Sequence, residues 1–471
     1  MNSNELKKNF YRKIFKLGLP IIIQNLLSAA VSSADVIMLN YVGQDAISAV
    51  SLASQYASVL FMVFYGLGTG VTMLCAQYYG KGDYHAIEVV EGIALRFSLI
   101  CSLLFAGLAL IIPRQLMCIF TNDTALITIG ASYLRSMSVA YLCWGVIEIY
   151  LSVLRSVGRV TICTILNMIT FGLNVLLNAT FIFGLFGAPK LGAMGVALAT
   201  SISRLVELIA CLLVSYRSKD VKLRFRHLFV RNKMLFQDFV RLSLPAMAND
   251  VVWGLAFSMY AVIIGHLGTD AVAANSFVTV VRNFGTILCF GIANAGTILI
   301  GNTLGENKLK KARVEAKHLM RLTVLSGILG GLIVLAASPI VLTYAKESLS
   351  PTSMHYLKYM LLINTYYITG TAVNTTLIAG IFRAGGDSRF GLICDTIDMW
   401  VYAVPMGFLA AFVFKLPVLW VYFILCTDEF VKWPWVLKRY KSEKWLKNIT
   451  RDDLFESKEC KFRLNGVAFS F

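Results

Sequence analysis

The fold is decided by a stretch that reads LGLPIIIQNLLSAAVSSADVIMLNYVGQDAISAV at residues 17–50 and recurs as LSLPAMANDVVWGLAFSMYAVIIGHLGTDAVAAN at residues 242–275. The spacing that relates Pro20 to Pro245 is kept without a gap by later landmarks, which are Gly43 and Gly268, Gly66 and Gly291, and Gly80 and Gly305. With a short insertion, Arg383 matches Arg155 in the same way. The chain is therefore predicted to contain two copies of one unit.

Each copy is apolar enough to lie in a membrane. Of the 471 residues, 57% are hydrophobic and 15% are charged, whereas soluble proteins typically carry about 25% charged residues. Runs of about 20 apolar residues, the length that crosses a bilayer, are expected near 14–41, 47–79, 87–112, 125–154, 160–186, 193–216, 239–265, 271–301, 318–344, 354–382, 390–414 and 417–437. Such long apolar runs do not suit the alternating strands of a β-barrel. The sequence predicts an all-α polytopic membrane protein, with about twelve transmembrane helices in two pseudo-symmetric six-helix lobes.

Basic residues gather in alternate loops. They crowd the N-terminus and recur at Lys81, Arg155, Arg159, 217–233, 308–317, Arg383, Arg389 and 438–447. The positive-inside rule places both termini in the cytoplasm, as an even number of spans also requires. Because the second copy begins after a basic loop, both copies enter the membrane from the same side and are parallel repeats. Transporters use that arrangement, and a scaffold for a membrane complex is the alternative.

These boundaries divide the chain into four segments. We expect an N-lobe at residues 1–216, a basic cytoplasmic linker at 217–238, a C-lobe at 239–440 and a cytoplasmic tail at 441–471. The tail beyond about residue 451, with Asp452, Asp453 and Cys460, follows no pattern that we can interpret. The expected location is the cell (cytoplasmic) membrane.

Composition and motifs exclude several classes of protein. A formal net charge of +17 would suit nucleic-acid binding only on a polar, water-exposed domain, and no segment is polar enough. The ten cysteines contain no C-x-x-C pair and lie mostly in apolar runs, which favours buried thiols over a metal site. The chain contains no G-x-x-x-x-G-K-[ST] motif, so it binds no ATP in a P-loop. Energy for transport would come from an ion gradient or a partner.

Polar side chains of three predicted spans in the first copy lie at one depth. Asp35, Asn174, Asn178 and Thr200 are all expected roughly 9 to 12 Å below the outer surface. A carboxylate, two amide oxygens and a hydroxyl suit a small hard cation such as Na⁺, or a buried acid that carries a proton. The alternative is hydrogen bonding between helices, which Asn and Thr often supply.

The second copy carries ionisable residues within or beside its spans. These are Asp250, Arg282, Asp395, Asp398 and Glu429. A role in substrate or proton handling and a charge pair between Arg282 and one of the aspartates are both open. Aromatic residues, chiefly Tyr141, Trp253 and Tyr367, could line a cavity for planar cations, or could pack in the core.

The chain resembles the multidrug and toxic compound extrusion (MATE) family over roughly residues 10–440. The most specific segments are LGLP at 17–20 leading to Asp35 and Gly43, residues 66–80 with Gln77, residues 154–158, and residues 174–178 followed by GAPKLGAMG at 187–195 and Ala199-Thr200. The resemblance implies a V-shaped pair of six-helix lobes that exports amphipathic, often cationic, compounds in exchange for sodium ions or protons.

The same resemblance implies roles for single residues. The family's N-lobe cation site maps onto Asp35, Asn174, Asn178 and Thr200, with Na⁺ held by the first three, and Pro20 matches a proline at which the first helix bends. One branch of the family carries acids in its seventh and tenth helices, where this sequence has Trp253 and Ala372. The chain is more similar to the bacterial branch that relies on the N-lobe acid.

The leading interpretation is a cation-coupled (Na⁺ or H⁺) antiporter that exports small amphipathic or cationic molecules. We expect a monomer in lipid, with no cofactor and no enzymatic activity. The runner-up is a lipid-linked precursor flippase of the same superfamily, in which Arg282 would be the main buried cation for pyrophosphate headgroups. An intramembrane enzyme is a third class, but no pair of catalytic acids lies at a common depth.

The charge alternation makes the topology testable. In whole cells, a cysteine introduced by Gln44→Cys should react with a membrane-impermeant maleimide, because residue 44 lies in an expected outer loop. A cysteine introduced by Arg224→Cys should react only after the cells are permeabilised. The reverse pattern of labelling would contradict the topology.

Overall fold

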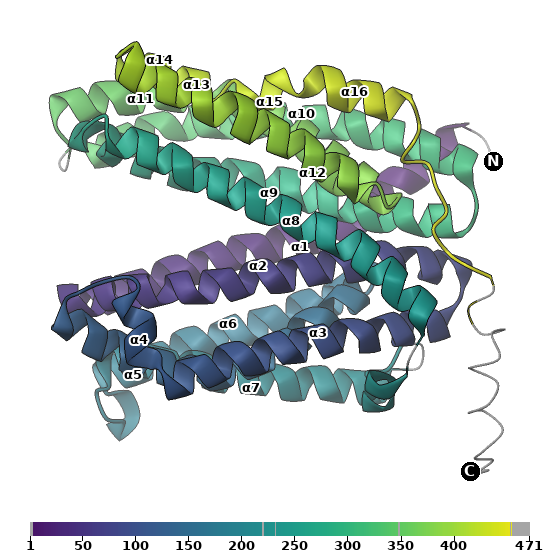
Figure 1. Ribbon diagram of the computed structural model, residues 1–471, viewed down its shortest axis with the longest axis horizontal. Coiled ribbons are helices and arrows are strands. Elements are labelled where there is room, and N and C mark those ends of the chain that lie inside the picture. The colour runs from purple at the N-terminus through teal and green to yellow at the C-terminus, as the bar shows by residue number, and fades with distance from the viewer. Residues whose placement is uncertain (1–2, 219–220, 231, 347–348, 453, 455–471) are drawn as a thin grey trace.

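The computed structural model describes residues 3–218, 221–230, 232–346, 349–452 and 454 (Figure 1). Helices and turns account for the regular structure of these residues, and no strand occurs among them. The first half comprises α1 (Ser3–Asn40), α2 (Gln44–Lys81), α3 (Tyr84–Ile111), α4 (Pro113–Cys118), α5 (Thr124–Ser156), α6 (Val160–Phe183), η1 (Leu185–Gly187), α7 (Gly192–Arg217) and η2 (Phe225–Phe229).

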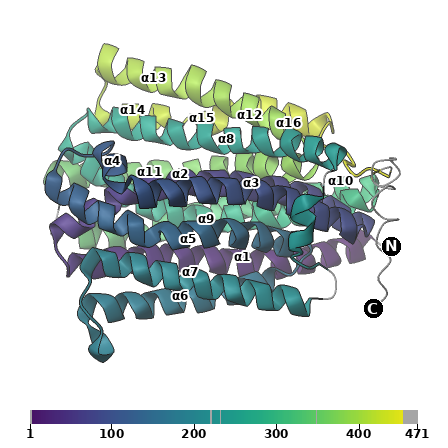
Figure 2. The same ribbon diagram turned by 60° about the horizontal axis from the view of Figure 1, so that its bottom comes forward.

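The second half repeats this order with more interruptions. It comprises α8 (Lys233–Gly265), α9 (Thr269–Gly305), α10 (Leu309–Ala345), α11 (Pro351–Thr375), η3 (Thr376–Phe382), α12 (Ser388–Thr396), η4 (Ile397–Ala403), α13 (Val404–Phe408), η5 (Leu409–Val413), α14 (Val418–Leu425), α15 (Asp428–Val431) and α16 (Trp433–Lys441). Figure 1 shows the two halves as separate groups of roughly parallel helices. In the turned view of Figure 2 the groups overlap, and the long helices still run roughly parallel. The predicted duplication therefore organises the whole molecule.

Ten helices in the described part of the chain are long and apolar enough to cross a membrane. The protein is a multi-pass membrane protein, as the sequence predicts. The expected spans at 354–382 and 417–437 are not among the ten. The first of them coincides with α11 and η3, and the second is divided among α14, α15 and α16, each of which is short. Both still run alongside the other helices of the second half (Figure 1).

Local sequence signals fix where the helices begin. The side chains of Asp83 and Asp123 accept hydrogen bonds from backbone N–H groups in the first turns of α3 and α5. Asn232 and Ser350 do the same for α8 and α11. Such caps satisfy N–H groups that have no partner within the helix. These caps fix the first residue of each helix at points where the chain turns back.

The two halves meet along α2, which packs against α8 and α9. Close approach depends on glycine: a Cβ atom added at Gly80 would lie 1.9 Å from the carbonyl oxygen of Asn302, and one at Gly305 would lie 1.8 Å from that of Gln77. A Cβ atom added at Gly70 would lie 1.7 Å from the hydroxyl oxygen of Ser243. The glycines at 66–70 and their counterparts in α9 therefore allow the helices to pack closely.

The start of α1 belongs to the core of the second half. Phe10, Ile14 and Leu17 are buried in one cluster with residues of α9, α10 and α16. The rest of the first half has its own core, built mainly from α2, α3 and α5. The first helix thus joins the two halves at the end of the molecule where both described termini lie (Figure 1). We call this the basic end, because the basic loops lie there.

Residues 442–452, which we call the strap, cross from the second half to the first at the basic end. The side chain of Gln77 donates to the carbonyl oxygens of Ala384 (2.7 Å) and Lys447 (3.1 Å) and accepts from the backbone N–H of Ile449 (2.8 Å). Arg451 donates to both carboxylate oxygens of Asp238, at 2.6 and 2.8 Å. The described part of the tail thus ties the halves together, whereas Asp453 and Cys460 lie outside the described residues.

Two basic residues that the sequence analysis counts as loop charges are not in loops. Arg155 ends α5 and pairs with Glu148 at 2.5 Å. Arg383 is 4% exposed and pairs with Asp250 at 2.7 Å. Both lie at the ends of spans with the side chain turned inward, which hydropathy alone does not reveal.

The contact between α2 and α9 predicts the effect of a larger residue. Gly305→Leu should lower the thermal stability of the protein in detergent, because overpacking typically costs about 1–3 kcal/mol. The measurement is the fraction of monodisperse protein on size exclusion after heating. Gly172→Leu is the matched control, because a Cβ atom at Gly172 on α6 meets no atom within 4 Å. Equal midpoints for the two variants would contradict this packing argument.

Candidate functional site

The four polar residues predicted in the first half form one chain of hydrogen bonds across α1, α6 and α7. The Asn178 side-chain amide donates to the Asp35 carboxylate at 2.6 Å and to the Asn174 carbonyl oxygen at 3.2 Å. The Asn174 amide donates in turn to the Thr200 hydroxyl at 3.2 Å. We call these four residues the N-half cluster. The structure brings the four residues together, because each contacts the next.

The N-half cluster offers oxygen atoms that have no partner. Asn178 is fully buried, and its Oδ1 atom accepts no hydrogen bond from the described residues. Asp35 is partly exposed, so its carboxylate remains accessible. Burying an unpaired amide oxygen beside a carboxylate is costly. The donor set fits a small hard cation or a proton.

Pro20 lies inside α1, which continues from Ser3 to Asn40. The Thr164 hydroxyl of α6 donates to its carbonyl oxygen at 3.1 Å. Proline removes one hydrogen bond from a helix and so weakens it locally. A bend at Pro20 stays a prediction.

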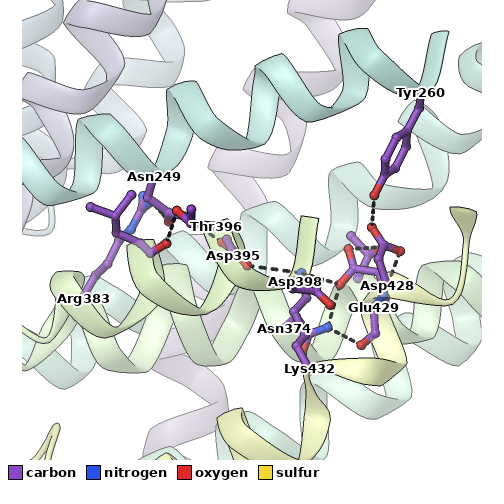
Figure 3. Close-up of polar contacts among 12 residues, drawn as sticks. Asn249, Tyr260, Asn374, Arg383, Asp395, Thr396, Asp398, Asp428, Glu429 and Lys432 are labelled. Atoms are coloured by element: carbon purple, nitrogen blue, oxygen red, sulfur yellow. Dashed lines mark hydrogen bonds and ion pairs between the residues drawn. The ribbon is translucent and has the colours of Figure 1, made fainter. Parts of the chain in front are cut away.

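A second cluster of ionisable side chains is buried in the other half (Figure 3). The Lys432 ammonium lies 3.3 Å from Asp395, 3.5 Å from Asp398 and 3.2 Å from Glu429. Asp428, which directly precedes Glu429 in the sequence, is likewise buried. We call Asp395, Asp398, Asp428, Glu429 and Lys432 the C-half cluster. It brings together the predicted Asp395, Asp398 and Glu429 with Asp428 of α15 and with Lys432, which lies between α15 and α16.

Neighbouring polar groups hold the acids of the C-half cluster in place. The Asn374 amide donates to the Glu429 carboxylate at 2.6 Å, and the Thr371 hydroxyl donates to the same group at 3.2 Å. The Tyr260 hydroxyl donates to Asp428 at 3.0 Å. Asp398, by contrast, accepts no hydrogen bond among the described residues and has only the lysine as a partner. The cluster is therefore incompletely satisfied.

The C-half cluster continues to Asp250 through Asn249 and Arg383 (Figure 3). The Asn249 amide donates to Asp395 at 2.7 Å, and Arg383 donates to Asn249 at 3.1 Å and to Asp250 at 2.7 Å. Sequence reasoning missed Lys432, Asp428 and Arg383. The rule that ionisable residues within spans are functional candidates applies to Lys432 and Asp428, and would have found them.

Two adjoining cavities lie beside these groups. One, of about 270 Å³, is lined by Trp253, Asp395, Glu429 and Lys432. The other, of about 460 Å³, is lined on the side of the first half by polar and aromatic residues that include Trp144, Glu148, Arg155 and Arg204. Both reach Arg383, so they meet between the halves. Of the aromatic residues predicted to line a cavity, Trp253 lines the first of these two.

Arg282 does not pair with an aspartate. Its guanidinium stacks over the rings of Phe257 and Tyr367, with 5.2 and 5.9 Å to the ring centroids. Tyr367 and Arg282 line a third cavity, separate from the two above. Tyr141, in contrast, is fully buried in the core of the first half beside Tyr56. Among the described residues Arg282 forms no charge pair with an aspartate, so that alternative is wrong.

Comparison with known proteins gives the same family for both halves. The model of a family described as MatE matches residues 20–180 and 245–409. The chain is 24% identical over 446 residues to an uncharacterized transporter YisQ of Bacillus subtilis, with 92% of this chain and 94% of that protein covered. It is also 24% identical to a probable multidrug resistance protein NorM of Thermotoga maritima, with 94% and 96% covered.

Solved structures share the fold. A Vibrio cholerae MATE transporter, VcmN in the bent form, has a TM-score of 0.83 at 17% identity, with 94% of this chain and all of that chain covered. A MOP superfamily transporter from Pyrococcus furiosus has a TM-score of 0.82 at 20% identity, with 94% and 99% covered. At these identities the similarity establishes the architecture.

The C-half cluster predicts a strong effect of removing its lysine. Lys432→Met should lower the thermal midpoint in detergent at neutral pH, because removing one partner of a buried ion pair typically costs about 3–5 kcal/mol. Adding Asp398→Asn to this variant should restore part of the loss, since one carboxylate then needs no counter-ion. Lys441→Met, at an exposed position of α16, is the control. A Lys432→Met variant as stable as wild type would show that the ion pairs contribute little.

Proposed function

This chain belongs to the MatE family, and from that premise we propose that it is a secondary active transporter that exports small amphipathic, often cationic, molecules in exchange for a sodium ion or a proton. It works as a monomer in the cell membrane, with both termini in the cytoplasm, and catalyses no covalent step. The halves rock against each other, so that the cavity between them opens alternately to either side of the membrane, as in other transporters built from repeats.

The N-half cluster is the observation that carries the proposal. It joins a carboxylate, two amides and a hydroxyl from three helices, and it leaves a buried Asn178 oxygen without a partner. A group of this kind in a span costs free energy unless a ligand completes it. Because α1 also packs into the core of the second half, a change at Asp35 can act on both halves through one helix.

We assign separate roles to the residues of the N-half cluster. Asp35 supplies the negative charge that a coupling cation neutralises, whether Na⁺ or H⁺. Asn174, Asn178 and Thr200 supply neutral oxygens if the ion is Na⁺ and hold the carboxyl group by hydrogen bonds if it is H⁺. Pro20, where α1 lacks a backbone hydrogen bond, is where we expect the helix to bend when the ion binds.

Relatives and the cavity walls support export of cations over the runner-up. Several relatives are named as multidrug resistance proteins, among them NorM and MdtK. The cavity beside Trp253 presents carboxylates of Asp395 and Glu429 together with aromatic surface, which suits a planar cation. A lipid-linked precursor flippase would need cations free to bind pyrophosphate in the cavity between the halves, where Arg383 and Lys432 are already paired. Arg282 lines a separate cavity inside the second half.

The proposal predicts that Asp35→Asn abolishes gradient-driven export. The amide keeps the size of the carboxyl group and can still contact Asn178, but it removes the charge that the cation neutralises. The measurement is export of a fluorescent cation from proteoliposomes without ATP, under a sodium or a proton gradient applied separately. The gradient that drives wild-type export identifies the coupling ion.

Two further variants make this test specific. Asp45→Asn removes an exposed acid in the first turn of α2 and should transport like wild type. Asn178→Ala should raise the cation concentration needed for half-maximal export, because one ligand is lost while Asp35 can still bind the cation. If Asp35→Asn exports at the wild-type rate, the N-half cluster is structural, and coupling lies elsewhere, with Asp250, Asp395 and Asp398 as the next candidates.

A further inference from the structure

A cavity of about 310 Å³ lies inside the second half, apart from the cavities between the halves. Its walls come from α8, α9, α11 and α14, and they include Phe257, Tyr260, Arg282, Tyr367 and Tyr422. Arg282 lies thirteen residues into α9, which places it roughly 20 Å along the helix and so near the middle of a span. A cation at this depth needs an explanation.

The guanidinium of Arg282 has aromatic neighbours but no acceptor. Its carbon atom lies 5.2 Å from the ring centroid of Phe257 and 5.9 Å from that of Tyr367. No hydrogen bond or ion pair of its side chain occurs with the residues that the structure describes. Stacking covers the faces of the planar group and leaves its N–H donors at the edge. Those donors can bind an acceptor that enters the cavity.

The acids of the second half are committed to other partners. Asp428 accepts from the Tyr260 hydroxyl with one oxygen and from the backbone N–H of Glu429 with the other. Asp395, Asp398 and Glu429 surround Lys432, and Asp250 pairs with Arg383. Arg282 is therefore a permanent cation with no assigned counter-ion.

The internal repeat shows how the two halves differ at this position. The spacing that relates Pro20 to Pro245 also relates Asp35 to Tyr260, and each lies five residues before the end of its helix. The same spacing relates Ala57 to Arg282. The second copy has thus replaced the acid by a phenol and an alanine by a guanidinium. At these two pairs of aligned positions the first copy carries an acid and the second copy carries a base.

We propose that the Arg282 cavity binds the anionic group of an aromatic or amphipathic ligand. The group is a carboxylate, sulfonate or phosphate monoester, which accepts hydrogen bonds from the guanidinium edge. The attached ring lies among Phe257, Tyr260 and Tyr422. A volume near 310 Å³ is at the lower end of small-molecule pockets, so it accommodates one compact ring system. This ligand class differs from the cations of the proposed export function.

Charge from the neighbouring C-half cluster limits the affinity. Asp428 shares Tyr260 with the wall of this cavity, and the cluster holds four carboxylates against one lysine. A competing explanation is that Arg282 only offsets this excess from a distance. The two explanations differ in what happens when Arg282 loses its charge, because only a binding site shows a preference among ligands.

Calorimetric titration of the full-length protein in detergent tests the proposal. Naphthalene-2-sulfonate should bind at least tenfold more tightly than naphthalene-2-sulfonamide, which has a similar shape but no charge. Arg282→Met should weaken sulfonate binding at least tenfold and leave the sulfonamide within twofold. Arg114→Met, which removes an exposed guanidinium on α4, should bind like wild type. Inorganic sulfate should not compete at equal concentration, because it lacks the ring.

Several results would overturn the proposal. They are equal binding of sulfonate and sulfonamide, undiminished sulfonate binding to Arg282→Met, and competition by sulfate at equal concentration. Loss of thermal stability in Arg282→Met that Asp428→Asn restores would assign Arg282 to charge compensation instead. If Arg282→Met does not fold, Arg282→Lys decides, since the preference for sulfonate must persist but shrink. The titration needs no gradient, so its failure is separate from failure of the export function.

Discussion

Charge burial in a medium that offers no water is the constraint on which the rest of this structure depends. An ionised side chain within a span costs several kcal/mol unless a partner compensates it. The protein meets this constraint in three ways. Lys432 is shared by three carboxylates, Arg383 pairs with Asp250 while also bonding Asn249, and Asp35 is held by Asn178 without any cation. The last of these leaves a negative charge for a ligand to neutralise.

Gene duplication produced two halves that solve the same problem differently. In the first half, neutral amides surround Asp35, and no described cation pairs with it. The other half supplies its own cations, Lys432 and Arg282, and places tyrosine where the first has its acid. In the transport cycle that we propose, this asymmetry confines the response to the gradient to the half that contains Asp35.

The sequence predicted the parts of this structure that depend on local pattern. Apolar runs predicted the helices, the repeat predicted the two halves, and depth along the helices predicted that Asp35, Asn174, Asn178 and Thr200 lie together. Arg383 was misplaced because hydropathy does not reveal which way a side chain at a span end points. The strap was not recognised, since Gln77 binds backbone carbonyl and N–H groups, which every residue possesses. Such contacts are specified by tertiary structure alone.

The strap also sets a scale for the energy of the proposed transport cycle. Opening the basic end requires Gln77 to give up three hydrogen bonds and α2 to leave α9 at Gly80 and Gly305. At a net value of about 0.5–1.5 kcal/mol each, the three bonds contribute roughly 2–4 kcal/mol. Reversing a two-state population from 1:99 to 99:1 requires about 5.5 kcal/mol of differential binding. The three hydrogen bonds of Gln77 therefore contribute less free energy than the differential binding that such a reversal requires, so the proposed binding of one coupling cation is sufficient to offset them.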